Sequence, residues 1–177
     1  AKAGGALTFA DPVPPTAPPS APVLAPPSAL LAGYLAEMAP YLPTIDYLLP
    51  NQEEAALLTG ESDPETAAAR FLEAGLGTYA AGRLPDHPAA RHLPAGGPAG
   101  TGAVVIKLGA DGCLICTRSR TIHVPGFLAR TVDTTGAGDT FVAAFLSRIL
   151  AGDDLADAGR FANRLAARST EHMGATP

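Results

Sequence analysis

The sequence predicts an α/β domain in which short apolar strands alternate with helices, and two segments carry that prediction. The β-branched run at residues 103–107 is typical of a strand buried on both faces. Residues 64–74 are predicted to form a helix, with Asp63 as N-cap, Pro64 at the first helical position and Gly75 as the stop. Alternation of such segments predicts a sheet covered by helices.

The remaining elements follow the same alternation. We expect short strands at residues 6–10, 45–49, 113–117 and 121–124. Helices are expected at residues 28–42, from Asn51 to residues 59–60, at residues 137–150, and after a cap at Asp153 or Asp154. Residues 128–132 lead from the last strand into a glycine-rich segment.

Length and composition favour a single domain. The chain has 177 residues, 47% of them hydrophobic, which suffices for one sizeable core. Two stretches look like low-complexity insertions: residues 12–28, with eight prolines, and residues 79–102, rich in Pro, Gly and Ala. Because the chain begins Ala1-Lys2-Ala3 and its first residues resemble a helix end running into a strand, we expect an upstream portion to be missing.

Charge and hydropathy narrow the functional classes. The net charge is −5, Lys2 and Lys107 are the only lysines, and the ten arginines are scattered, so we expect no nucleic-acid surface. No run approaches the roughly 18 apolar residues of a membrane span, and the first residues of the chain lack the charged, apolar, small-residue pattern of a signal sequence. We therefore expect a cytoplasmic protein that acts on small molecules; an organelle stays open because the N-terminus is missing.

The cysteines and histidines do not indicate a metal site. Cys113 and Cys116 form a C-x-x-C inside a predicted strand, whose period of two directs their sulfurs to opposite faces. Two buried thiols are therefore expected. The histidines show no ligand spacing; they are His87, His92, His123 and His172.

The glycine-rich segment Thr134-Thr135-Gly136-Ala137-Gly138 lies between a predicted strand and a predicted helix. Glycines let the backbone approach a ligand, and the first N–H groups of a helix favour an anion such as phosphate. The segment is not a Walker A loop, because no Lys-Ser/Thr follows, and it lacks the G-x-G-x-x-G spacing of dinucleotide-binding folds.

Asp139, in the first turn of the following helix, leaves two interpretations open. A carboxylate beside a phosphate repels it, which suits catalysis, where the carboxylate accepts a proton from an attacking hydroxyl. Alternatively, Asp139 only interacts with the helix dipole.

The segment 132–141 contains Asp133-Thr134-Thr135-Gly136-Ala137-Gly138-Asp139 and resembles a signature of the ribokinase-like carbohydrate kinases of phosphofructokinase-B type. The resemblance implies ATP- and Mg²⁺-dependent phosphorylation of a sugar hydroxyl. It implies that Asp139 is the catalytic base and that the backbone N–H groups of Gly136, Ala137 and Gly138 form an anion hole.

A second segment, residues 50–60, resembles the N-x-x-E segment of the same family. By that resemblance, Asn51 and Glu54 position Mg²⁺, indirectly through its waters, and the nucleotide phosphates. Taken alone, Asn followed three residues later by Glu is better explained as a capping box. Beside the glycine motif, the functional interpretation is favoured.

Three further segments match the family in sequence order. Residues 107–112 resemble its ATP-contacting strand and turn, residues 161–163 its nucleotide-proximal helix, and residues 169–175 its V-T-R-x-G-A, with Glu171 replacing Arg. The implied nucleotide contacts are Lys107, Gly109, Gly112 and Asn163, and the implied K⁺ site is formed by Asp133, Thr135 and Gly174. An ordinary hairpin turn and an ordinary helix face are the alternatives for the first two segments.

The resemblance implies a three-layer α/β/α fold represented by its C-terminal portion only, with the N-terminal half and the lid missing. Within this family, the motifs are most similar to those of ribokinase. The implied partners are a sugar and ATP. The full-length protein would be of a kind that often forms homodimers. The sequence departs from the family at Asp11-Pro12-Val13, where D-P-N is common, and at its two insertions. A catalytically incompetent fragment or pseudokinase, acting as a scaffold or assembly partner, is the alternative function, because half a sheet leaves an exposed edge. An incomplete gene model is a third reading.

Overall fold

The computed structural model describes residues 8–12, 35–78 and 102–174. The two predicted insertions therefore lie outside the described residues, apart from Pro12 and Gly102. The predicted strand at residues 6–10 and helix at residues 28–42 are described only in part.

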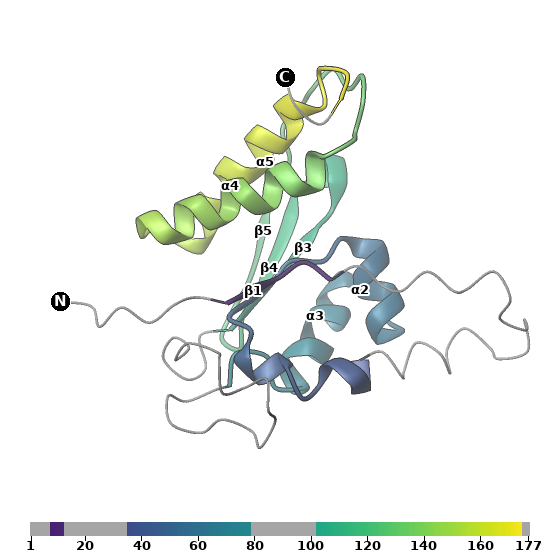
Figure 1. The fold of residues 1–177 in the computed structure, drawn as a ribbon, viewed down its shortest axis with the longest axis vertical. Helices are drawn as coiled ribbons and strands as arrows, with labels where there is room; N and C mark the ends of the chain where they lie inside the picture. The colour runs from purple at the N-terminus through teal and green to yellow at the C-terminus, as the bar shows by residue number, and fades with distance from the viewer. Residues whose placement is uncertain (1–7, 13–34, 79–101, 175–177) are drawn as a thin grey trace, which may run out of the picture.

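One sheet of five strands runs through the described part of the chain (Figure 1). The strands lie in sequence order: β1 (Phe9–Ala10), β2 (Tyr47–Leu48), β3 (Ala103–Lys107), β4 (Cys113–Cys116) and β5 (Thr121–Val124). The first three are parallel to one another, and β4 and β5 continue the sheet as antiparallel hairpins. Three carboxyl ends of parallel strands therefore meet at one edge of the sheet.

Helices cover both faces of this sheet (Figure 1). On one face lie α2 (Gln52–Thr59) and α3 (Pro64–Glu73), and on the other α4 (Ala137–Ala151) and α5 (Leu155–Ser169). Phe71 of α3 and Phe145 of α4 are the largest fully buried side chains of the two layers. The predicted three-layer α/β/α architecture is confirmed.

Strand β3 contributes side chains to the hydrophobic cores on both faces of the sheet. Val104 and Ile106 contact the α2 and α3 side, whereas Val105 contacts the α4 and α5 side. All three side chains are fully buried. A strand buried on both faces reads as a continuous apolar run, as the sequence predicts here.

The two cysteines lie on opposite faces of β4, as predicted. Cys113 is buried with α4 and α5, and Cys116 is buried with α2 and α3. Both are free thiols. Burial raises the pKa of Cys113 to about 12 and also raises the pKa of Cys116.

We expect neither thiol to react with iodoacetamide at pH 8 in the folded protein, because burial blocks access and suppresses the reactive thiolate. Intact-mass spectrometry after timed labelling measures this directly. The same protein in guanidinium chloride is the control and should take two labels, whereas rapid labelling of the native chain would contradict the buried position of β4.

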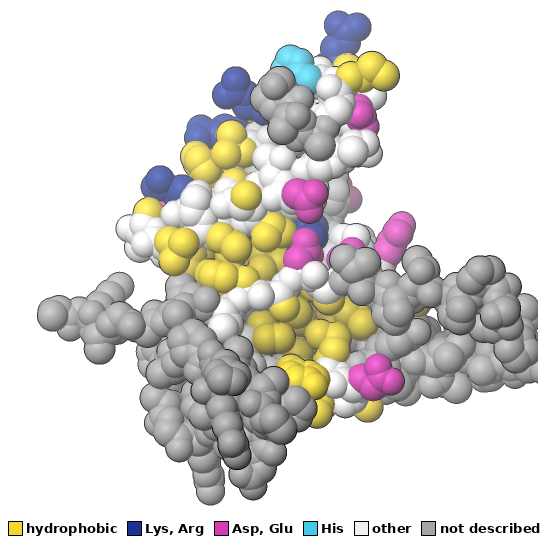
Figure 2. Space-filling model, viewed as in Figure 1, with side chains coloured by type: hydrophobic (Ala, Val, Ile, Leu, Met, Phe, Trp, Pro, Cys, Tyr) yellow, Lys and Arg dark blue, Asp and Glu magenta, His cyan; other side chains and the backbone are white. Residues whose placement is uncertain are grey.

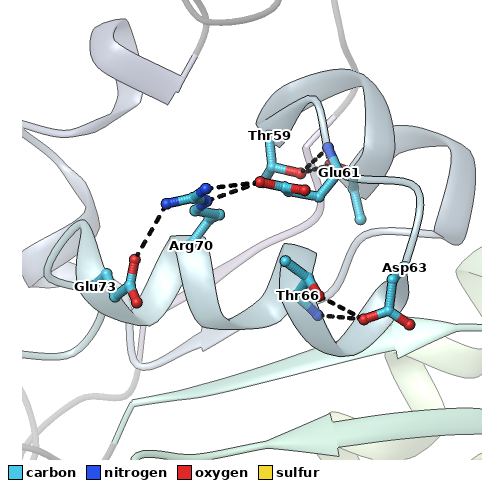
Figure 3. A network of polar contacts seen from close by, with 7 residues as sticks. Thr59, Glu61, Asp63, Thr66, Arg70 and Glu73 are labelled. Carbon is cyan, nitrogen blue, oxygen red and sulfur yellow. Dashed lines mark hydrogen bonds and ion pairs between the residues drawn. The ribbon is translucent and has the colours of Figure 1, made fainter.

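The helix starts follow the predicted capping chemistry. Asp63 caps α3 by accepting hydrogen bonds from the backbone N–H and the hydroxyl of Thr66, at 2.8 and 2.6 Å (Figure 3). Arg70 of α3 reaches back to Glu61, with Nη2 at 2.8 Å from Oε1, and approaches Glu73 at 3.7 Å. These exposed contacts fix the turn that joins α2 to α3.

Two predicted elements end earlier than the sequence pattern indicates. The helix predicted over residues 28–42 is helical at residues 35–38 in its described part and then turns. Pro40 explains this, because proline has no N–H and disfavours helical geometry in the residue before it. The strand predicted over residues 45–49 narrows to Tyr47–Leu48, although Leu49 still donates to the carbonyl of Ala10 at 2.9 Å.

The helix pair α4 and α5 shows apolar side chains on the side visible in Figure 2.

Among the described helices, none has the length and apolar character needed to cross a membrane.

Candidate active site at the carboxyl ends of the parallel strands

The structure brings two predicted site residues, Asn51 and Lys107, to one edge of the sheet, together with Asp11. Asp11 follows β1, Asn51 follows β2, and Lys107 ends β3. The Lys107 N–H donates to the carbonyl of Pro50 at 2.9 Å, and Asn51 and Lys107 form a parallel bridge. In open α/β sheets, ligands bind in the crevice outside the carboxyl ends of the strands.

The glycine motif meets this edge from the opposite layer. A β-carbon at position 138 would lie 3.9 Å from Lys107 Nζ, so the first turn of α4 faces the end of β3. Gly136, the N-cap, has φ 76°, a left-handed conformation that favours glycine. This turn directs the N-terminus of α4 toward Lys107 at the end of β3.

No side chain caps α4. The N–H of Ala137 donates to the carbonyl of Thr134 at 3.1 Å, and that of Thr140 donates to Gly136 at 2.9 Å. The N–H groups of Gly138 and Asp139 come before the first regular helical hydrogen bonds, so they are the ones a ligand would use. Asp139 is exposed in this same turn, where a proton acceptor would lie beside a bound anion.

Asn51 and Glu54 form a complete capping box at the start of α2. Asn51 Oδ1 accepts the N–H of Glu54 at 2.8 Å, and Glu54 Oε2 accepts the N–H of Asn51 at 2.7 Å. The structural alternative for this pair is therefore present in the fold. The capping box uses Asn51 Oδ1 and Glu54 Oε2, and Glu54 Oε1 does not take part in it.

Lys107 carries an ion pair at the centre of the site. Its Nζ lies 2.7 Å from Asp11 Oδ1, and the two side chains are 12% and 32% exposed. The Lys107 side chain is thus mostly covered, and its Nζ faces the start of α4.

Asp133, Thr135 and Gly174, the residues of the predicted K⁺ site, are joined by hydrogen bonds. Asp133 Oδ1 accepts from the N–H and the hydroxyl of Thr135 at 2.9 and 2.7 Å, and Oδ2 accepts the N–H of Gly174 at 3.0 Å. The hydrogen bond from the backbone N–H of Gly174 contributes most to lowering the pKa of Asp133. The cluster joins the loop before α4 to the chain after α5.

Gly109 and Gly112 belong to the tight turn between β3 and β4. Gly112 needs its glycine, because its φ is 98° and a β-carbon there would meet the carbonyl oxygen of Val124 at 2.1 Å. A β-carbon on Gly126 would lie equally close to the carbonyl oxygen of Ala110. The turn and the segment after β5 are therefore packed backbone to backbone.

An open groove of about 610 Å³ runs beside this turn and next to the start of α2. The groove is lined by Gln52, Pro64, Leu108, Ala110, Asp111, His123, Pro125 and Gly126. It places the predicted ATP-contacting turn at the wall of a cavity.

Asn163 is buried in α5, and its amide is committed to the protein. Nδ2 donates to the carbonyls of Val124 and Pro125, at 3.0 and 3.1 Å. The Asn163 side chain thus anchors the segment that follows β5, and this segment lines part of the groove. Its predicted nearness to a nucleotide remains a prediction.

Sequence reasoning missed several residues of this edge. Asp11 was noted only as a departure from the family pattern, and its pairing with Lys107 joins residues 96 positions apart. His123 shows no ligand spacing in the sequence, yet it lines the groove. Their positions at the ends of predicted strands were the only available signal.

The described residues contain no group of three or more His, Cys, Asp or Glu side chains that could hold a metal ion.

Known proteins share these features. The family model of the pfkB carbohydrate kinases matches residues 20–177. A sugar kinase of Archaeoglobus fulgidus that is described as uncharacterized is 34% identical over 80% of this chain and 46% of its own length. Ribokinase of Staphylococcus aureus is 30% identical over 99% of this chain and 45% of its own length.

A solved structure of a putative ribokinase II from E. coli, in complex with ATP and Mg²⁺, matches 86% of this chain and 42% of that one, with a TM-score of 0.60 and 25% identity. The chain spans about half the length of the curated relatives it matches. The family model covers most of the chain, and the α/β fold and the glycine motif agree with that match. The chain therefore belongs to the pfkB family of carbohydrate kinases.

Proposed function

We propose that this chain carries the phosphate-binding and proton-accepting side of an ATP-dependent sugar kinase. The observation that supports it most is the meeting, at one edge of the sheet, of the uncapped start of α4 with Lys107. A helix start with free N–H groups and a nearby ammonium together favour a bound phosphoryl group.

In the proposed reaction, Asp139 accepts the proton of a sugar hydroxyl. The hydroxyl oxygen forms a bond to the γ-phosphorus of ATP as the bond from that phosphorus to the β,γ-bridging oxygen breaks and ADP leaves with the electron pair. The N–H groups of the segment Gly136, Ala137 and Gly138 stabilise the charge on the transferring group. Because the N–H of Ala137 donates to Thr134 here, Gly138 is the better placed donor.

Glu54 would hold magnesium by accepting hydrogen bonds from its water ligands at Oε1, and the amide N–H groups of Asn51 would donate to phosphate oxygens. Bound Mg²⁺ would neutralise charge on the phosphates. The Asp133 cluster, with Thr135 and Gly174, is the proposed place of a monovalent cation such as K⁺, because its carboxylate is held in one orientation by three hydrogen bonds.

The groove beside the β3–β4 turn is the proposed place of the nucleoside part of ATP. Its volume of about 610 Å³ is in the range of small-molecule sites, and its lining includes Leu108, which follows Lys107, and Gln52 at the start of α2. Gly109 and Gly112 would allow the backbone to pass close to the ligand, and Asn163 would keep the far wall in place.

Calorimetric titration with Mg-ATP, followed by a coupled assay for ADP with a panel of pentoses, hexoses and nucleosides, tests this function. Binding of Mg-ATP and sugar-dependent ADP release support the kinase. A chain that binds Mg-ATP and releases no ADP fits a partial site. A folded chain that does not bind Mg-ATP contradicts the proposal and favours the scaffold alternative.

Glu54→Gln separates the capping role from the magnesium role. Gln also completes a capping box, so helix α2 should keep its stability. The lost carboxylate charge should weaken binding of Mg-ATP about 10- to 100-fold, as loss of a group that orients metal ligands does. Calorimetry and thermal unfolding on the same sample measure both effects.

Glu53→Gln is the matched control, since Glu53 is an exposed acidic residue in the same helical turn. It should leave Mg-ATP affinity close to that of the wild type. Equal affinities for both variants would mean that Glu54 acts only as part of the cap.

A further inference from the structure

The ion pair between Asp11 and Lys107 occupies an electrostatically unusual position. The start of a helix carries a partial positive charge, so a cation there is unfavourable unless an anion accompanies it. Lys107 Nζ lies 3.9 Å from the place of a β-carbon on Gly138, in the first turn of α4. Two sources of positive potential therefore converge at one point.

Asp11 supplies the compensating charge in this structure. Its Oδ1 lies 2.7 Å from Nζ, and the Lys107 side chain is 12% exposed. Without a partner, a cation on a largely covered side chain beside a helix N-terminus is unfavourable. Asp11 thus makes this position tolerable when no phosphate is bound.

The same carboxylate would oppose an incoming phosphate. Lys has three N–H donors, and the hydrogen bond to Asp11 leaves others for a second anion. An anion that contacts Nζ would lie within a few ångströms of Asp11, where like charges repel.

We propose that Asp11 is the resident counter-ion of Lys107 and that the ammonium is shared between Asp11 and the phosphoryl group of the nucleotide. This inference rests on the proposed function. Asp11 is a positioning residue that sets the affinity of the site for phosphate through Lys107. It lowers that affinity and so favours release of the nucleotide product.

The test is a double-mutant cycle with Mg-ATP as the titrant. Asp11→Asn keeps an oxygen acceptor for Lys107 and removes the charge, so Mg-ATP should bind about three- to tenfold more tightly. Lys107→Met removes the ammonium and should weaken binding about 10- to 100-fold. In the Lys107→Met background, Asp11→Asn should have little further effect.

Asp153→Asn is the control, because Asp153 forms an ion pair of similar length with Arg148, at 2.6 Å, beyond the other end of α4. It should leave Mg-ATP affinity unchanged. Asp11→Glu keeps the charge and should bind Mg-ATP about as the wild type does. A purely structural role for Asp11 would change stability without tightening binding.

A second measurement needs no Asp11 variant. Since Lys2 and Lys107 are the only lysines, ¹⁵N-lysine labelling gives at most two ammonium signals, and Lys107→Met assigns them. We expect the Lys107 signal to shift when Mg-ATP binds.

The outcomes separate this inference from the function on which it rests. If the wild type binds Mg-ATP but the Lys107 signal does not move, or Asp11→Asn does not tighten binding, the shared-ammonium inference is wrong and the kinase proposal stands. An equal effect of Asp11→Asn with and without Lys107 also overturns it. A wild type that does not bind Mg-ATP overturns both.

Discussion

Asp139→Asn should reduce sugar phosphorylation about 10²- to 10⁴-fold, the usual contribution of a positioned general base. Asn has the same shape and cannot accept the proton of the attacking hydroxyl. Because Asp139 is exposed in the first turn of α4, removing its charge also removes repulsion toward the phosphate. Affinity for Mg-ATP should therefore stay the same or rise while turnover falls.

Asp157→Asn is the matched control for this prediction. Asp157 is the acidic residue in the first turn of α5, as Asp139 is in α4. If Asp139 serves only the helix dipole, both variants should lose similar, small amounts of stability and neither should lose turnover. Steady-state kinetics and thermal unfolding of the two variants distinguish catalysis from helix stabilisation.

Phe145→Ala should destabilise the folded chain by about 3–5 kcal/mol, as deletion of a fully buried aromatic side chain does. Phe145 stacks on Phe141, with ring centroids 6.1 Å apart, and meets Tyr47 edge to face at 6.0 Å. Its loss opens a cavity between α4 and the sheet. Guanidinium unfolding followed by circular dichroism measures the change.

Leu150→Ala, on the same helix, is the comparison. Leu150 is 69% exposed, so its removal should change the free energy of unfolding by less than about 0.5 kcal/mol. A loss below about 1 kcal/mol for Phe145→Ala would indicate that α4 packs less tightly on the sheet than the structure shows. Since α4 begins two residues before Asp139, such looseness would also bear on the site.

Local patterns were enough to predict most of the elements. Strand β3 occupies the predicted residues, and α3 and α4 differ from the prediction by one residue at one end. Caps and buried runs are local signals, which explains this success. The helix expected to reach residue 42 did not, because Pro40 outweighed the apolar spacing of Leu35 and Met38.

The site was predicted less completely than the fold. The glycine motif and the Asn51–Glu54 pair are short in sequence, and each was visible from its own segment. Asp11 was not, because its partner Lys107 is 96 residues away and the two meet only when β1 and β3 lie in one sheet. Asn163 was expected beside a nucleotide, and the structure adds that its amide binds the end of β5.

The amino-acid sequence by itself determined the order of strands and helices, the two opposite faces of β4 and the glycine-rich turn at the start of α4. Those features depend on spacing within a few residues. Only the tertiary structure decided that Asp11 neutralises Lys107 at that helix start and that a groove lies beside the β3–β4 turn. These features depend on which strand ends become neighbours, and parallel pairing brings together residues that the sequence keeps far apart.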